Sequence, residues 1–313
     1  VERFRAKATK AKQAQSRLKM IEKLKFTVTP QEAALRKFTF PEPEELSPPI
    51  VAIESGSVGY DGKAVLSKLD LRIDQDDRIA LLGRNGEGKS TLAKVMLRLL
   101  EASGGEVYLN GKKFFSHRGP SLRRARKNLQ VVFQDPYSSL DPRMKIHEIV
   151  AEPLRINGGY SADRVNELLA HVGLTPEAGL RRPPEFSGGQ RQRIAIARAL
   201  ALNPDVLILD EAVSALDVSV QAQVLDLLDD VQEKFGIAML FITHDLRVAA
   251  QICDEVLVMQ KGVVVEHGPA GEVLAAPRHD YTRNLIEAAP GRHWDFANFR
   301  ALDRTTPATG ATL

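Results

Sequence analysis

The sequence predicts an α/β fold with a mostly parallel sheet covered by helices and a small antiparallel β layer. Short apolar runs such as 206–209 and 238–242 recur with helix-like segments between them. These runs are apolar on both faces, as the buried strands of a parallel sheet are. A glycine-rich loop joins one run to a helical pattern, which is a second feature of α/β folds that bind ligands at strand ends.

Composition and charge indicate an ordinary globular protein. The chain has 313 residues, of which 43% are hydrophobic and 27% are charged. Cys253 is the single cysteine, so no intrachain disulfide is expected and a reducing, cytosolic setting is the default. The apolar runs are far shorter than the roughly 20 residues of a membrane-spanning helix, and the basic N-terminus lacks the apolar segment of a signal peptide.

We expect residues 1–38 to form a basic amphipathic helical arm. Residues 1–25 carry nine Lys or Arg and two Glu, and apolar residues recur there at three- and four-residue steps. Two interpretations remain open: a solvated helix that packs on a partner helix, or a contact with nucleic-acid phosphates. A Pro-rich, acidic linker follows at 39–49, and the globular part begins at about residue 50.

The antiparallel layer is predicted by two turn signals. Asp61-Gly62 and Asn110-Gly111 each separate two apolar segments, and both dipeptides favour the turns of tight hairpins.

The loop "GRNGEGKST" is predicted to hold a phosphate. Its glycines let backbone N–H groups close around phosphate oxygens, the following helix adds partial positive charge, Lys89 adds a full charge, and the Ser90 hydroxyl can coordinate magnesium. The alternative is an ordinary Gly-rich turn between a strand and a helix. The candidate nucleotide-binding residues of the loop are Gly83, Arg84, Asn85, Gly86, Glu87, Gly88, Lys89, Ser90 and Thr91.

Polar residues follow three further strand-like runs, where ligands bind in open α/β sheets. Gln134, the pair Asp210 and Glu211, and His244 each come directly after an apolar run, so we expect them to converge near the loop. Asp210 can hold magnesium and Glu211 can act as the general base for an attacking water. Gln134 can bind the metal and sense the γ-phosphate, and His244 can donate to that phosphate. A helix cap for the acidic pair, and structural roles for Gln134 and His244, are the alternatives.

A second glycine-rich loop, "EFSGGQRQR", begins another helix aimed at an anion. With the first loop, Gln134, "LILDEA", "SALD" and "THD" in this order, it resembles the nucleotide-binding domain of ABC-type P-loop ATPases over residues 50–290. The resemblance implies that ATP and Mg²⁺ are bound between two such domains, either two copies or this chain and a sibling. It implies that Ser187, Gly188, Gly189 and Gln190 of one domain cap the γ-phosphate held by the other, and that Asp217 lies at the dimer seam. Tyr60 would stack on adenine, the alternative being an exposed hairpin tyrosine.

From about residue 97 onward, "FQDPYSSLDPRM", the "SGGQRQR" region and "RHDYTRNLIEAAP" resemble the ATP-hydrolysing subunits of bacterial dipeptide and oligopeptide importers. This resemblance implies a helical subdomain at about 135–185 that contacts integral membrane permease subunits, and a place at the cytoplasmic face of the membrane. The tail at 291–313 is expected to be flexible. Some such subunits bear a C-terminal iron–sulfur cysteine cluster, which a chain with Cys253 alone cannot form.

Residues 1–96 resemble a different group, the ABC-F ATPases that act on ribosomes, because of the basic arm, the Pro-rich linker and the loop "GRNGEGKST". The chain therefore resembles a join of two relatives near 94–104. Under the importer hypothesis the chain energises peptide import, and under the alternative hypothesis residues 1–25 contact the ribosome or its RNA. A third hypothesis is a dimerising ATPase module that is coupled to neither process.

Overall fold

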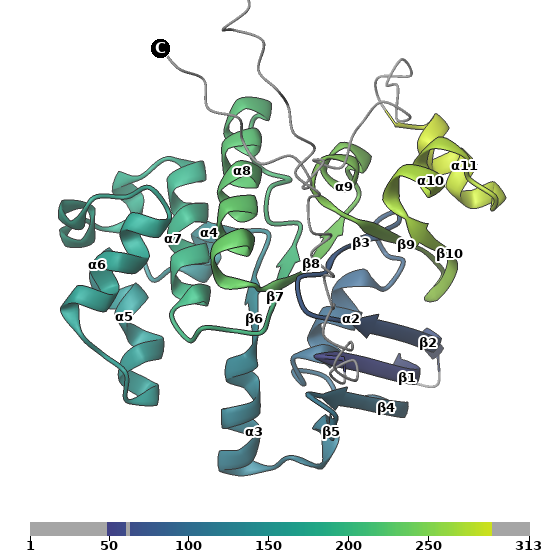
Figure 1. Cartoon of the computed structure of the whole chain (residues 1–313), viewed down its shortest axis with the longest axis horizontal. Helices are drawn as coiled ribbons and strands as arrows, with labels where there is room; N and C mark the ends of the chain where they lie inside the picture. The colour runs from purple at the N-terminus through teal and green to yellow at the C-terminus, as the bar shows by residue number, and fades with distance from the viewer. Residues whose placement is uncertain (1–48, 61–62, 290–313) are drawn as a thin grey trace, which may run out of the picture. The chain divides into compact units, whose positions relative to one another are not determined.

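Two β-sheets organise the part of the chain that the computed structural model describes, residues 49–60 and 63–289. The first sheet has the order β2-β1-β4-β5 and the second the order β10-β9-β3-β8-β7-β6 (Figure 1). The strands are β1 Val51–Tyr60, β2 Lys63–Ile73, β3 Arg78–Leu82, β4 Gly104–Leu109, β5 Lys112–Lys113, β6 Leu129–Val132, β7 Val206–Asp210, β8 Ala238–Thr243, β9 Glu255–Gln260 and β10 Val263–Pro269.

The four-stranded sheet is the predicted antiparallel layer, and both hairpins are confirmed. β1 pairs with β2 from Val51 to Tyr60 around residues 61–62, and Leu109 pairs with Lys112 around Asn110-Gly111. Asn110 and Gly111 have φ of 49° and 70°, so both central residues are left-handed. Such a turn matches the twist of its two strands, which is why Asn-Gly is favoured there.

The six-stranded sheet is parallel from β9 to β6, with β10 added antiparallel at one edge. Alternate residues of its central strands enter two different cores, because side chains alternate across a strand. In β8, Ala238, Leu240 and Ile242 pack with the antiparallel layer and α2, whereas Met239 and Phe241 pack with the helices of the opposite face. Both faces are buried, so the predicted fold class is confirmed.

Helices cover the second face, and those between Pro136 and Leu200 form the group at the left of Figure 1. The α-helices are α2 Lys89–Met96, α3 Gly119–Ala125, α4 Pro136–Ser139, α5 Ile146–Asn157, α6 Ala162–His171, α7 Gly188–Leu200, α8 Val218–Phe235, α9 Leu246–Ile252, α10 Ala270–Ala275 and α11 Asp280–Glu287. Short 3₁₀ turns are η3 Phe114–Ser116, η4 Arg126–Asn128, η5 Pro176–Leu180 and η6 Pro183–Glu185. The range predicted as a helical subdomain, 135–185, thus contains α4, α5, α6, η5 and η6.

Several predicted segments lie outside the described residues: the arm at 1–38, the linker up to residue 48 and the tail at 291–313. Among the residues described, no helix combines the length and the apolar character needed to cross a membrane.

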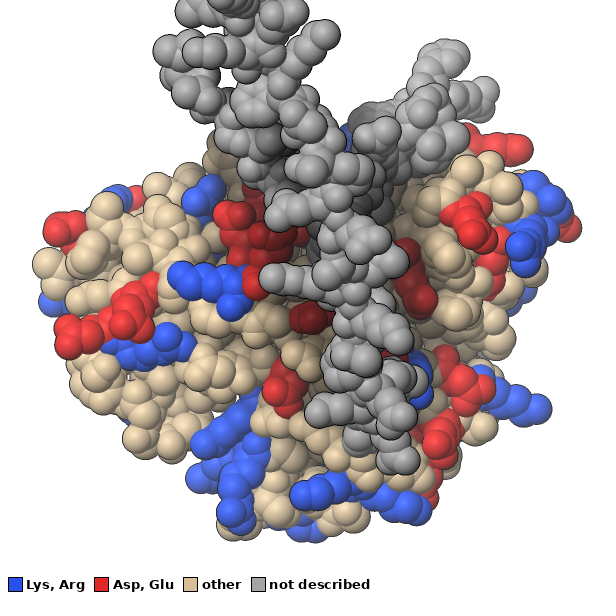
Figure 2. All heavy atoms as spheres, in the orientation of Figure 1, with Lys and Arg blue, Asp and Glu red and all other residues tan. Residues whose placement is uncertain are grey.

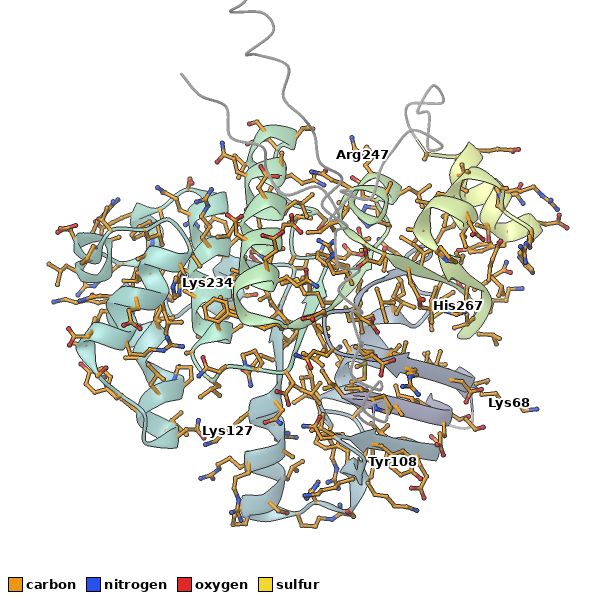
Figure 3. The ribbon with its side chains drawn as sticks, viewed as in Figure 1. Lys68, Tyr108, Lys127, Lys234, Arg247 and His267 are labelled. Atoms are coloured by element: carbon orange, nitrogen blue, oxygen red, sulfur yellow. The ribbon has the colours of Figure 1, made fainter. Side chains whose placement is uncertain are left out.

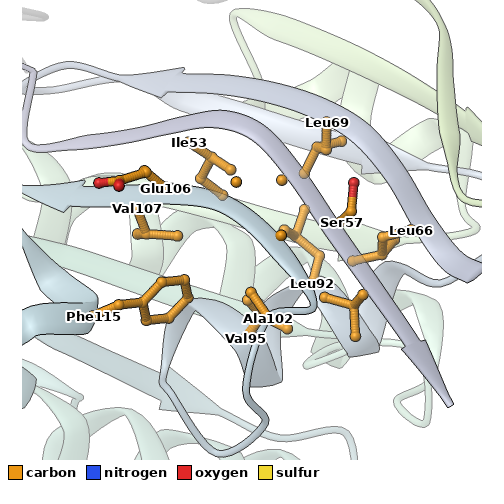
Figure 4. A pocket seen from close by; sticks show the side chains of 14 residues that line it. Ile53, Ser57, Leu66, Leu69, Leu92, Val95, Ala102, Glu106, Val107 and Phe115 are labelled. Atoms are coloured by element: carbon orange, nitrogen blue, oxygen red, sulfur yellow. The ribbon is translucent and has the colours of Figure 1, made fainter.

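A hollow under the antiparallel sheet is mostly apolar. It lies between β1, β2, β4 and α2, and its lining includes Ile53, Leu69, Leu92, Val107 and Phe115 (Figure 4). A site for a charged ligand needs convergent polar groups, so this hollow is part of the core packing and not the nucleotide site.

Basic side chains gather on the surface at α3 and β5, at the lower end of the view in Figure 2. Lys112, Lys113, Arg118, Arg123 and Arg124 are all exposed there. This end of the described domain is therefore a basic surface.

Candidate functional site

The parallel sheet brings three sets of candidate residues together at one edge. β3, β8, β7 and β6 are consecutive neighbours, and the pairings Leu82 with Thr243 and Asp210 with Ile242 align their carboxyl ends. Because parallel strands end at the same edge, the phosphate loop after β3, Asp210 and Glu211 at β7, and His244 after β8 come together.

The phosphate loop has the backbone that its glycines permit. Gly86 and Gly88 have φ of 90° and 97°, a conformation that side chains disfavour. A Cβ on Gly88 would lie 2.9 Å from Leu66 Cδ2, and one on Gly83 would lie 2.5 Å from the Met259 carbonyl oxygen. Gly88 is also the N-cap of α2 and has no side chain to cap the helix. The N–H groups in the first turn of α2 can therefore donate hydrogen bonds to an anion.

Lys89 is folded into the loop and is only 4% exposed. Its Nζ donates to the carbonyl oxygens of Gly83 at 2.6 Å and Arg84 at 2.8 Å. Burial lowers the pKa of Lys89, while the nearby carboxylates of Glu211, Glu87 and Asp210 oppose that shift. The loop thus encloses one ammonium group that can neutralise phosphate charge.

Ser90 and Asp210 meet across the mouth of the loop. The Ser90 hydroxyl donates to Asp210 Oδ1 at 3.0 Å. Burial raises the pKa of Asp210, with a smaller contribution from the charge of Glu211, and the Ser90 hydrogen bond opposes the shift. A half-buried carboxylate next to a hydroxyl gains from a cation, and this pair of oxygens is chemically suited to Mg²⁺.

Glu211 and His244 lie beside this pair. His244 Nδ1 is 3.4 Å from Glu211 Oε1, and the side chain of Glu211 is 11% exposed against 49% for His244. Glu211 has φ of 49°, and its N–H donates to the Ile242 carbonyl oxygen at 2.8 Å. This backbone hydrogen bond therefore positions the Glu211 side chain at the edge of the sheet.

The other loop residues differ in where they point. Arg84 and Asn85 are exposed, and Thr91 is half-buried in the first turn of α2. The Glu87 carboxylate instead accepts from the Lys261 N–H and from the Tyr281 hydroxyl, so it faces the β9–β10 turn and α11.

Gln134 and Tyr60 are less tightly placed. Gln134 follows β6 by two positions and its side chain is exposed. Tyr60 ends β1, and its side chain is outside the described part of the structure. Their proposed roles therefore depend on the family resemblance.

The second glycine-rich loop lies at the start of α7. Its hydrogen bonds are separate from those of the phosphate loop. The Ser187 hydroxyl accepts from the Gln190 N–H at 3.3 Å, and the Gln190 side-chain oxygen accepts from the Ser187 N–H at 3.1 Å, a capping box. Ser187 is exposed, and Gly188 is half-buried. Gly189 permits a close helix contact, since a Cβ there would lie 2.2 Å from Val220 Cγ1.

Asp217 is the N-cap of α8. Its Oδ1 accepts from the Val220 N–H at 3.0 Å and the Ser219 hydroxyl at 2.8 Å, and these hydrogen bonds lower the pKa of Asp217. It is exposed, as Ser187 is.

Three long-range contacts at the site carry no local sequence signal. Tyr281 contacts the phosphate loop from α11, and Arg191 of α7 stacks on the Tyr137 ring, with its guanidinium carbon 3.6 Å from the ring centre. Arg198 of α7 donates to the Ser139 carbonyl oxygen at 2.6 Å. The segment after Gln134 is thereby joined to the helix that Ser187 begins. The motifs "RHDYT" and "DPY" were visible in the sequence, but spacing alone does not reveal their partners.

Comparison with known families identifies the domain. A family model described as ABC transporter matches residues 66–214, and a second one with the same description matches residues 1–40. The first match runs without a break across residues 94–104. The predicted join there, and with it the resemblance of residues 1–96 to ABC-F proteins, is therefore not supported.

Individual relatives agree with the family match. The chain is 49% identical over 229 residues to the glutathione import ATP-binding protein GsiA of Escherichia coli K12, and equally to that of Shigella sonnei, a match that covers 72% of this chain. The matched region spans 37% of the length of those relatives.

Solved structures share the fold. The structure of cbiO1 from Clostridium perfringens, part of the ABC transporter complex cbiONQ, has a TM-score of 0.68 and 31% identity, and the match covers 73% of this chain and 92% of that one. The ATP-binding cassette MJ0796, solved as a dimer in a post-hydrolysis state with ADP and Pi, has a TM-score of 0.63 and 28% identity, covering 70% of this chain and 98% of that one. The chain belongs to the ABC transporter family, as an ATP-binding domain of it.

Proposed function

We propose that this chain binds ATP with magnesium, hydrolyses it, and energises the import of di- or oligopeptides through separate membrane subunits. The observation that carries the proposal is the Ser90–Asp210 contact at the mouth of the loop that encloses Lys89, with Glu211 beside it. Phosphoryl transfer depends mainly on positioning and on neutralising charge, and these groups supply both.

The donor set fits magnesium. Mg²⁺ is commonly held by one or two carboxylates, hydroxyl or water oxygens and the phosphates of the substrate, so it needs no cage of protein ligands. Ser90 and Asp210 would hold the ion, with Gln134 as a further ligand by resemblance. The ion would neutralise charge on the transferred phosphoryl group.

Each protein group has a distinct task in hydrolysis. Lys89 and the first turn of α2 bind the phosphates, Glu211 accepts a proton from the attacking water, and His244 donates to the γ-phosphate. Tyr60 stacks on adenine, and the Ser187–Gln190 loop and Asp217 of a second domain complete each site. Two nucleotides then lie between two domains, which close on ATP and separate after hydrolysis.

Two observations support import as the coupled process. The 49% identity is to proteins named for glutathione import, and glutathione is a small peptide. The helices between residues 136 and 185 also expose large apolar side chains, with exposed fractions of 63% for Ile156 and 69% for Leu180. Exposed apolar side chains can contact a protein partner, here the permease subunits at the cytoplasmic face of the membrane.

Membrane fractionation tests the coupling. The chain should sediment with membranes when peptide-importer permease subunits are co-expressed and stay in the supernatant without them. Ile156→Ser with Leu180→Ser should reduce that association at least several-fold. Val263→Ser, a change at an exposed apolar residue of β10, serves as the matched control and should leave it intact. Deleting residues 1–40 should also leave it intact. Pelleting with ribosomes, weakened steeply by salt, would overturn the import proposal.

A further inference from the structure

The phosphate loop contains a carboxylate, that of Glu87, two positions before Lys89. A negative charge in a loop built to bind a triphosphate lowers affinity unless it is held away from the anion, because like charges at short range repel. The position of the Glu87 side chain therefore matters for nucleotide binding.

The β9–β10 turn holds one side of Glu87. Its carboxylate accepts from the Lys261 N–H, and its own carbonyl oxygen accepts from the Gly262 N–H at 3.2 Å. Lys261 and Gly262 have φ of 48° and 78°, so both central residues of this turn are left-handed. A Cβ on Gly262 would lie 1.9 Å from the Val65 carbonyl oxygen, so the turn is closely packed against β2.

The hydroxyl of Tyr281 holds the other side. It donates to Glu87 Oε1 at 3.4 Å and accepts from the Arg84 N–H at 3.0 Å, across 197 residues of sequence. Tyr281 is 8% exposed, and burial raises the pKa of its phenol, so the group stays protonated as a donor. One buried hydroxyl thus bridges two positions of the phosphate loop.

The start of α11 is itself held by β10. The Glu266 carboxylate accepts from the N–H groups of Arg278 at 2.7 Å and His279 at 3.1 Å, and His279 Nδ1 accepts from the Tyr281 N–H at 3.1 Å. These contacts set where the Tyr281 ring enters the domain. These hydrogen bonds therefore stabilise the segment "RHDYT" at the start of α11.

We propose that Tyr281 is a positioning residue of the nucleotide site: its hydroxyl keeps the Glu87 carboxylate turned away from the phosphates and orients the Arg84 end of the loop. The inference rests on the proposed ATP-binding function and deepens it, because it makes α11 a determinant of the affinity of the phosphate loop.

The test is calorimetric titration with the slowly hydrolysed analogue adenylyl imidodiphosphate and Mg²⁺. Tyr281→Phe keeps the ring and should weaken binding by about fivefold to tenfold, the net value of a typical hydrogen bond. The loss should shrink at high salt, since repulsion by a released carboxylate is screened. Glu87→Gln in the Tyr281→Phe chain should restore affinity, because the released side chain is then neutral.

Two further variants make the result specific. Glu87→Asp shortens the side chain and draws the carboxylate back from the Tyr281 hydroxyl, so it should reproduce the salt-dependent loss with α11 untouched. Tyr108→Phe changes a tyrosine of the antiparallel layer, seen in Figure 3, and should bind as the unaltered chain does.

The outcomes separate this inference from the proposed function. If the unaltered chain fails to bind the analogue, the proposed function fails. If the unaltered chain binds but Tyr281→Phe binds equally well, or if its defect persists when Glu87 is neutralised, then Tyr281 only packs α11 and the inference is overturned.

Discussion

Glu211 shows at the scale of one residue how the fold positions a candidate general base. Its backbone has φ of 49°, which costs a non-glycine residue free energy, and the Ile242 carbonyl oxygen accepts its N–H. Residues are held in such conformations when their surroundings require it. Here the result is a carboxylate beside His244, next to the Ser90–Asp210 pair.

Glu211→Gln should retain ATP binding and lose turnover by about 10²-fold or more, because an amide cannot accept a proton from water as a general base does. Steady-state phosphate release measures the loss, and titration with the nucleotide analogue checks that binding is retained. Glu233→Gln, an exposed change on α8, should behave as the unaltered chain does. Unchanged turnover in Glu211→Gln would exclude this residue as the base.

At the scale of elements, α7 and α8 approach closely because Gly189 has no side chain. The space that a Cβ would need is occupied by Val220, whose Cγ1 would lie 2.2 Å away. Ser187 and Asp217 are the N-caps of these two helices, so the close packing at Gly189 also positions these two candidate residues of the dimer seam. Gly189 thus has a packing role as well as the phosphate role that the resemblance implies.

Gly189→Ala should reduce the free energy of unfolding by about 1–3 kcal/mol, the usual effect of overpacking. Urea unfolding measures it. Adding Val220→Ala should recover part of the loss, because it removes the colliding methyl group. Gly188→Ala is the matched control: its Cβ would lie an ordinary 3.6 Å from Leu216 Cδ2, and it should unfold as the unaltered chain does. Equal stability of Gly189→Ala and Gly188→Ala would contradict the packing role.

At the scale of the whole molecule, the described domain places only some of the candidate site residues next to its own phosphate loop. Lys89, Ser90, Asp210, Glu211 and His244 meet at one sheet edge. Ser187 instead keeps its hydrogen bonds within the first turn of α7 and is exposed. An exposed helix start that can bind an anion suits the nucleotide of a second domain, and a related cassette is known as a dimer with ADP and Pi.

ATP should therefore convert the Glu211→Gln chain from monomer to dimer, because nucleotide bound at the interface stabilises the closed pair and slow turnover preserves it. Size-exclusion chromatography with light scattering measures the mass. A chain that also carries Lys89→Ala should stay monomeric, since it lacks the buried ammonium that we propose binds phosphate. A strictly monomeric preparation that hydrolyses ATP at full rate with Ser187 replaced would refute the two-domain site.

The sequence by itself determined the features that depend on residues close together in the chain. These are the two hairpins, the buried strands, the glycine loop and the polar groups at the ends of β3, β6, β7 and β8. It also determined that the groups at β3, β7 and β8 meet, because the ends of adjacent parallel strands share an edge. Only the tertiary structure decided that Tyr281 reaches the loop, that the Glu87 carboxylate accepts from the Lys261 N–H, and that Val220 fills the space beside Gly189. Such contacts join residues far apart in the chain, and they depend on the sheet order β10-β9-β3-β8-β7-β6 and on how α7, α8 and α11 pack, which no local pattern specifies.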